Sequence, residues 1–142
     1  MGGSVRLELT GDEALVLFDK GLARRFDARL KQAGQLTSKG RFLAAPWIGM
    51  LETGAWVGRA AHANAMATKL AELITTRTPY PLAHPVQANA VFVRMDEAPL
   101  QRLKAEGWFV YRFLDGSVRF MCSWATTGEA VEEIGEALVR LA

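Results

Sequence analysis

The sequence is poor in residues that bind metals or crosslink chains. Its 142 residues include one cysteine, Cys122, and two histidines, His62 and His84. A single cysteine excludes an internal disulfide and favours a reducing compartment. These nitrogen and sulfur ligands share no spacing typical of a zinc site, so we expect no metal. Cys122 alternates with Phe120 and Val118 along a predicted strand, which favours a place in the core over a role as a nucleophile.

Clustered charge and long apolar runs are also lacking. The formal net charge is +2, and lysine and arginine form no cluster of the kind that nucleic-acid binders use. The first apolar run, residues 14–18, is too short for a signal core or a membrane span. No glycine-rich phosphate loop is present. We therefore expect a cytoplasmic globular protein with no nucleic-acid or membrane partner.

The first third of the chain predicts one strand followed by a helix. Residues 13–18 (EALVLF) contain a continuous apolar run, Ala14 to Phe18, that ends at Asp19, as in a strand buried on both faces of a mostly parallel sheet. Such a strand needs neighbours that nothing upstream supplies. From Lys20 to about Gln35, helical spacing predicts an amphipathic helix. Its apolar positions are Leu22, Phe26, Leu30 and Ala33.

Two further helices are expected before a proline-rich linker. Thr37 or Ser38 is expected to cap a helix that Pro46 kinks or restarts, because proline lacks a backbone donor. Residues 55–75 are rich in alanine and predict a closely packed helix. Residues 75–85 contain three prolines and predict a loop.

The second half begins with a predicted strand, helix and strand. Residues 89–93 and 108–113 have the apolar and aromatic composition of strands. Between them, Asp96 is expected to cap a helix with Pro99 in its first turn and Gly107 just past its end.

A hairpin and a last helix follow. Asp115-Gly116 predicts a two-residue type I′ turn, after which residues 117–123 return antiparallel. Thr126 and Glu129 fit a capping box. The core-facing stripe of the last helix is predicted to be Val131, Ile134, Leu138 and Leu141.

Together these elements predict an α/β protein whose second half is α+β. Residues 1–50 are expected to be the residual end of a larger domain, with one strand and helices. Residues 51–142 are expected to form a long connecting helix and a small domain, in which helices cover a three-stranded antiparallel sheet.

Arg119 stands out as a charge inside an apolar strand. Alternation places it on the same face as Met121 and Ser123, opposite Val118 and Phe120. A guanidinium on a rigid strand suits a carboxylate, which it binds through two parallel hydrogen bonds. The alternative is a solvated arginine paired with a nearby glutamate, a common feature of one-sided sheets.

The order of segments resembles the threonine aldolase and β-eliminating lyase family, which has the aspartate-aminotransferase fold of pyridoxal-phosphate enzymes. The resemblance covers almost the whole chain. It is carried by residues 13–19 (EALVLFD), 32–45 (QAGQLTSKGRFLAA), 61–67 (AHANAMA), 89–93 (NAVFV) and 118–124 (VRFMCSW). Each segment is weakly specific by itself, but five in the same order are fairly specific.

The resemblance implies roles for three residues. Arg119 corresponds to the arginine that binds the carboxylate of the amino-acid substrate. The region of Ser38, Lys39 and Arg41 resembles a segment near the phosphate of the pyridoxal phosphate cofactor, often at a neighbouring subunit's site, and Ser38 and above all Lys39 are the expected contacts. A helix-capping Ser38 and a solvated Lys39 are the alternatives. The complete family enzyme cleaves β-hydroxy-α-amino acids to glycine and an aldehyde.

The departures from the family concern the cofactor. The family's cofactor lysine lies in a loop before the strand that matches residues 14–18, and Arg6 stands at about that position here. Arginine stays protonated and forms no Schiff base. The part of the family that precedes this region has no counterpart in the sequence. We therefore predict no catalytic residue in this chain and no cofactor bound by the chain alone.

Three hypotheses remain. The chain is the substrate-carboxylate-binding part of a pyridoxal-phosphate lyase, completed by a missing N-terminal domain or by a homo-oligomer. Alternatively, it is a non-catalytic remnant that self-associates to cover apolar surface. A third hypothesis, an independent ligand-binding module, leaves the first half unexplained.

Overall fold

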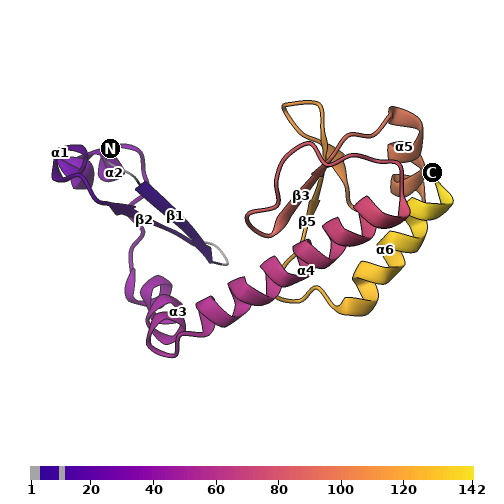
Figure 1. The fold of residues 1–142 in the computed structure, drawn as a ribbon. Coiled ribbons are helices and arrows are strands. Elements are labelled where there is room, and N and C mark those ends of the chain that lie inside the picture. The colour runs from indigo at the N-terminus through magenta and orange to yellow at the C-terminus, as the bar shows by residue number, and fades with distance from the viewer. Residues whose placement is uncertain (1–3, 10–11) are drawn as a thin grey trace. The chain divides into compact units, whose positions relative to one another are not determined.

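The computed structural model describes residues 4–9 and 12–142, with side chains from Leu15 onward, and the chain divides into two compact units (Figure 1). The units span residues 1–55 and 56–142. The predicted boundary at residues 50 and 51 lies close to this division, and the origin of the first unit in a larger domain stays a prediction. Among the described residues, no helix has the length and hydrophobicity to span a membrane.

The first unit opens with an antiparallel pair of strands. β1, Ser4–Leu9, pairs with β2, Asp12–Leu17, in the register Arg6 to Leu15. The apolar run is therefore a strand, but the prediction of a place in a mostly parallel sheet is wrong for the described residues. Leu15 and Val16 are 45% and 43% exposed. The short connection between the two strands permits an antiparallel hairpin, whereas parallel pairing needs a long crossover.

The predicted helix over residues 20–35 is broken in two. α1 spans Lys20–Ala23 and α2 spans Phe26–Gln32, with Arg25 between them at a φ of 60°. Leu22, on the expected apolar stripe, is exposed. Short helices without a packed face are marginal, because nucleation costs more than the few hydrogen bonds return.

The third helix starts later than predicted and passes through its proline. α3 spans Arg41–Glu52 with Pro46 inside it. Gly40 is its N-cap residue and makes no side-chain cap hydrogen bond, so the predicted cap at Ser38 or Thr37 is wrong. Lys39 adopts a φ of 63°, which bends the chain away from helical geometry just before this helix begins.

The second unit contains the predicted three-stranded antiparallel sheet. β3 spans Ala90–Val93, β4 spans Tyr111–Arg112 and β5 spans Val118–Met121, in the order β3-β5-β4. The return strand β5 is therefore central. Phe92 and Tyr111 are its two partners at Arg119, one on each side.

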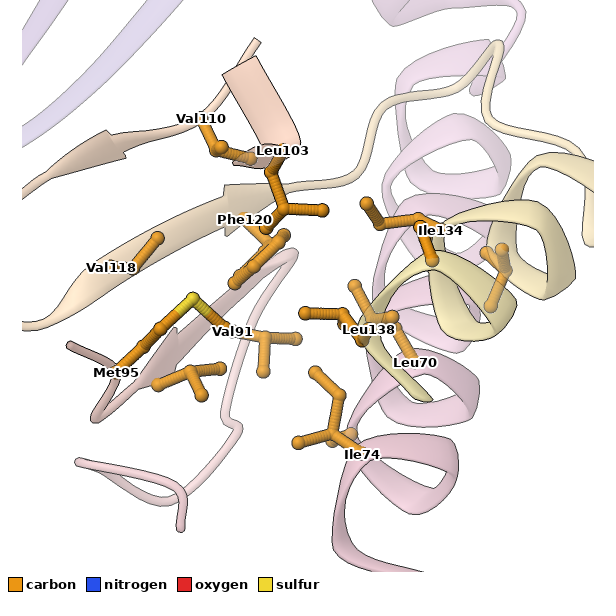
Figure 2. Close-up of a cluster of buried hydrophobic side chains, with 14 of the residues drawn as sticks. Leu70, Ile74, Val91, Met95, Leu103, Val110, Val118, Phe120, Ile134 and Leu138 are labelled. Carbon is orange, nitrogen blue, oxygen red and sulfur yellow. The ribbon is translucent and has the colours of Figure 1, made fainter. Parts of the chain in front are cut away.

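Three helices enclose the core with one face of this sheet. α4 spans Ala55–Arg77, α5 spans Glu97–Ala105 and α6 spans Gly128–Arg140. Figure 2 shows their side chains directed at those of the sheet. The fully buried residues with the largest side chains are Ile74, Leu100, Leu103, Leu138, Val91, Val93, Val118 and Val131.

The predicted pattern of buried and exposed residues is confirmed in this unit. Val118, Phe120 and Cys122 are buried, as the alternation predicts, whereas Met121 is 54% exposed. On α6, Val131, Ile134 and Leu138 are buried. Leu141 packs partly buried against the same core.

Two local predictions need correction. The hairpin loop has three residues, Leu114 to Gly116, because the Phe113 N–H donates to the Ser117 carbonyl. Gly116 takes a φ of 82° and closes the loop as a bulge, which replaces the predicted two-residue type I′ turn. The last helix is capped by Thr127, whose hydroxyl accepts from the Ala130 N–H, one residue after the predicted cap.

Candidate functional site

Arg119 lies in the middle of the sheet face that the core does not use. Its neighbours along β5, Val118 and Phe120, point into the core, so its own side chain points to the opposite face. The side chain is half-buried there. The sequence predicts this orientation, and the structure confirms it.

Two aromatic rings flank the guanidinium of Arg119. Its Cζ atom lies 4.7 Å from the ring centroid of Tyr111 and 5.1 Å from that of Phe113. These distances are typical of cation–π contacts, in which the negative ring face attracts the cation. These two contacts offset part of the hydration energy that the guanidinium loses on burial, so its burial does not require a carboxylate.

No carboxylate among the described residues lies within ion-pair distance of Arg119. Arg112 differs, because its Nη2 atom lies 2.7 Å from Oε2 of Glu97. The Nε atom of Arg119 is buried and has no hydrogen-bond partner among the described residues. The structure therefore does not pair Arg119 with a described glutamate, which was the alternative to a binding role.

A further aromatic pair supports this face. The ring of Phe92 meets that of Phe113 edge to face at a centroid distance of 5.3 Å. His84 packs against Phe92 in the same manner at 5.5 Å. Its Nε2 atom lies 2.5 Å from Oδ2 of Asp115, which attaches the proline-rich segment to the hairpin loop.

We name the group of His84, Phe92, Tyr111, Phe113 and Arg119 the outer-face cluster. Of these five residues, only Arg119 was predicted from the sequence. A signal for two of the others was present, since Tyr111 and Phe113 are two residues apart and so share a strand face. Their place beside Arg119 depends on the register between β4 and β5.

The two predicted phosphate contacts lie in the first unit. Ser38 and Lys39 are exposed in the turn before α3. The carbonyl oxygens of Lys39 and Gly40 accept hydrogen bonds from the N–H groups of Phe42 and Leu43. The two side chains make no hydrogen bond to another described residue. Arg6 pairs with Leu15 through its backbone in β1, and its side chain lies outside the described residues.

An open cavity of about 550 Å³ lies elsewhere on the second unit. It contains none of the predicted site residues. Its lining is Pro79, Tyr80, Pro81, Arg94, Met95, Asp96, Asp115 and Gly116. No group of three or more potential metal ligands occurs among the described residues.

Comparison with known proteins connects these features to one family. The chain is 47% identical over 133 residues to the low specificity L-threonine aldolases of Pseudomonas sp. (strain NCIMB 10558) and Pseudomonas aeruginosa. Each match covers 93% of this chain and 38% of the relative, so the chain spans less than half the length of these relatives. A scan against protein-family models finds no match.

A solved structure agrees with the sequence comparison. The fold matches that of Leishmania major threonine aldolase with a TM-score of 0.75 at 26% identity. The match covers 92% of this chain and 39% of that one. The predicted resemblance and the mixed α/β fold are both confirmed. In sequence and in fold, the chain corresponds to the C-terminal part of a threonine aldolase.

Proposed function

We propose that this chain is the substrate-carboxylate-binding part of a pyridoxal-phosphate-dependent, threonine aldolase-like lyase. Arg119 is the residue that binds the carboxylate. The observation that supports this role is a guanidinium in cation–π contact with two aromatic rings and with no carboxylate partner among the described residues. A half-buried cation in that state has donors available for an anionic ligand.

The substrate class follows from the relatives. We propose that the complete enzyme cleaves β-hydroxy-α-amino acids to glycine and an aldehyde, with pyridoxal phosphate supplying an electron sink. Arg119 contributes by orientation, since two parallel hydrogen bonds from a guanidinium hold a carboxylate in one plane. Orientation of this kind lowers the entropic part of a barrier and moves no proton.

The described residues do not fit a complete cofactor site. The open cavity is lined by no lysine. Lys69, on the long helix α4, donates to Glu132 over 3.0 Å rather than standing free in a pocket. We propose no catalytic residue in this chain.

For the cofactor phosphate we propose contacts from Ser38 and Lys39. Both side chains are exposed where α3 begins, and the positive end of a helix dipole favours an anion there. The left-handed backbone of Lys39 costs energy for a residue with a Cβ, a kind of strain that often accompanies function.

The first unit exposes apolar side chains that a partner would cover. Phe18, Phe42 and Ile48 are 67%, 64% and 54% exposed. We propose that the remainder of the enzyme or a second copy packs on them, in the cytoplasm, where the lone Cys122 stays reduced. The same exposure favours the second candidate function, a self-associating remnant without activity.

Titration of the isotopically labelled full chain with L-threonine and with glycine tests the carboxylate site. We expect the backbone amide nuclear magnetic resonance signals of the strand partners of Arg119, Phe92 and Tyr111, to shift with both amino acids at concentrations of about 1 mM or higher, because one partly exposed ion pair contributes little affinity. L-Threoninol, which lacks the carboxylate, is the matched control and should leave the signals in place.

Two substitutions distinguish the positive charge of Arg119 from the planar shape of its guanidinium. Arg119→Leu should abolish the shifts. Arg119→Lys should weaken binding by about tenfold, because an ammonium cannot form the two-pronged contact. Equal responses to threonine and threoninol would overturn the proposal. Absence of binding together with concentration-dependent dimers in sedimentation would favour the self-associating remnant.

A further inference from the structure

We propose that Tyr111 and Phe113 are positioning residues that hold the guanidinium of Arg119 in one plane and direct its Nη edge toward the ligand. This inference rests on the proposed role of Arg119 and adds the geometry of binding. It assigns the ligand carboxylate an end-on contact with the two Nη atoms, rather than a side-on contact that includes Nε.

The sheet register explains why the two rings lie beside Arg119. Tyr111 is the direct partner of Arg119 across the β4–β5 ladder. Side chains of directly opposed residues in an antiparallel pair stand about 5 Å apart on the same face. Phe113 follows two residues later and therefore also faces this side. Both rings come within contact distance of the guanidinium, at 4.7 Å and 5.1 Å from Cζ.

The buried Nε atom determines which edge is available. A guanidinium binds a carboxylate through either Nε and one Nη atom or through both Nη atoms. The Nε atom of Arg119 is buried, and no other residue that the structure describes forms a hydrogen bond with it. Neither Nη atom is buried in this way, and neither makes a hydrogen bond to another described residue. A carboxylate arriving from solvent therefore meets the Nη edge.

Contacts behind the rings restrict their movement. Phe113 packs edge to face on Phe92, which in turn packs on His84. The hydrogen bond between His84 and Asp115 connects these packed rings to the hairpin loop. Tyr111 has an edge contact with Phe109, but the Phe109 side chain is 95% exposed and gives little support. Phe113 is therefore the more firmly held of the two rings.

The test compares aromatic and aliphatic variants of the full chain. The variants are Tyr111→Leu, Phe113→Leu and Tyr111→Phe, with Phe109→Leu as the matched control because its ring does not contact Arg119. The first readout is the Nε–Hε resonance of Arg119 without ligand, which we expect the ring currents of Tyr111 and Phe113 to displace in the unsubstituted chain. The second readout is the dissociation constant for L-threonine.

We expect each leucine variant to move the ligand-free Nε–Hε resonance toward the position of a free arginine. Each should also weaken threonine binding about three- to fivefold, the scale of one partly exposed cation–π contact. Tyr111→Phe keeps a ring and should retain both properties, as should Phe109→Leu. Leucine variants with an unchanged resonance and unchanged affinity would overturn the inference, and so would a Tyr111→Phe variant that behaves like Tyr111→Leu.

Different results would contradict the carboxylate role of Arg119 and the positioning role of Tyr111 and Phe113. If the unsubstituted chain binds no threonine, Arg119 does not bind the carboxylate. The ligand-free resonance still shows whether the rings hold the guanidinium. If the Phe113→Leu variant unfolds, the pair of Tyr111 variants decides the question through both readouts.

Discussion

The Nε2 atom of His84 lies 2.5 Å from Oδ2 of Asp115 and joins the proline-rich segment to the tip of the β4–β5 hairpin. The other carboxylate oxygen, Oδ1, accepts from the N–H of Ser117 over 3.0 Å and from its hydroxyl over 2.6 Å. The hydrogen bonds from Ser117, followed by that from His84, hold the pKa of Asp115 well below its ordinary value. The Asp115 carboxylate therefore holds His84 in place, and His84 packs on Phe92, which in turn packs on Phe113.

The first prediction concerns acid stability. Because the pKa of Asp115 is lower in the folded chain than in the unfolded one, its ionised form stabilises the fold above the ordinary value of 3.8. This stabilisation is lost as the pH falls toward the lower folded value. Asp115→Asn should lower the Tm at neutral pH and reduce the fall in Tm between about pH 5 and about pH 2.5. Thermal unfolding followed by circular dichroism measures both.

Ser117→Ala is the companion variant for that prediction, because Ser117 supplies the largest part of the pKa shift. It should reduce the acid dependence without removing it. Parallel curves of Tm against pH for Asp115→Asn and the starting chain would show that the hydrogen bonds to Asp115 do not stabilise the fold.

The second prediction concerns Tyr80. Burial raises the pKa of its phenol above 10.0, and nearby Asp96 raises it further, whereas Arg102 lowers it in part. The hydroxyl donates to the Leu141 carbonyl over 2.6 Å. The neutral phenol therefore stabilises the fold below the ordinary pKa, and this stabilisation is lost as the pH rises through the folded value.

Phenolate absorbance measures the titration of Tyr80. The sequence has two tyrosines, so Tyr80→Phe leaves Tyr111 alone and the difference isolates Tyr80. We expect a midpoint above 10.0 for that difference. At neutral pH the substitution should lower the free energy of unfolding by about 0.5–1.5 kcal/mol, the net value of one hydrogen bond. A midpoint at or below the ordinary value would contradict the burial of this side chain.

The third prediction concerns the packing of α6 on α4. A Cβ added at Gly135 would lie 3.0 Å from Cγ of Leu73 and closer still to its two methyl carbons. Leu73 is buried, so its side chain has to shift within the core to make room for the added methyl group. Overpacking costs about 1–3 kcal/mol, and the helical preference of alanine over glycine offsets about 1 kcal/mol. Gly135→Ala should therefore lower the free energy of unfolding by about 1 kcal/mol in urea denaturation.

Gly58→Ala is the matched control for that substitution. Gly58 lies within α4, and a Cβ there would meet nothing within 4 Å. The free energy of unfolding should rise by up to about 1 kcal/mol, because alanine is the better helix former. If both alanine variants stabilise the chain, Leu73 is not confined as the structure indicates.

Elements with a strong period were predictable from the sequence. The buried positions Val118, Phe120 and Cys122 follow from period-two alternation, and Val131, Ile134 and Leu138 follow from helical spacing. Each of these side chains lies on the apolar face of its strand or helix, and that face packs on the same core. Local pattern and tertiary environment therefore agree for them.

Boundaries and caps were less predictable. The shift of the cap from Thr126 to Thr127 arises because Thr126 is used elsewhere. Its hydroxyl accepts from the Ser123 N–H, and its carbonyl oxygen contacts His62. The three-residue loop likewise depends on the pairing of Phe113 with Ser117. Where two neighbouring residues are equally suited to cap a helix or to close a turn, tertiary packing determines which of them does so.

The sequence by itself determined the sheet, its covering helices, the direction of the Arg119 side chain and the resemblance to threonine aldolases, because these depend on periodicity and on residue order. The surroundings of Arg119 were decided by the tertiary structure alone. Tyr111 reaches it through the β4–β5 register and Phe92 through the β3–β5 register. Register is a property of strand pairs, and a shift of one residue would place every ring on the other face of the sheet.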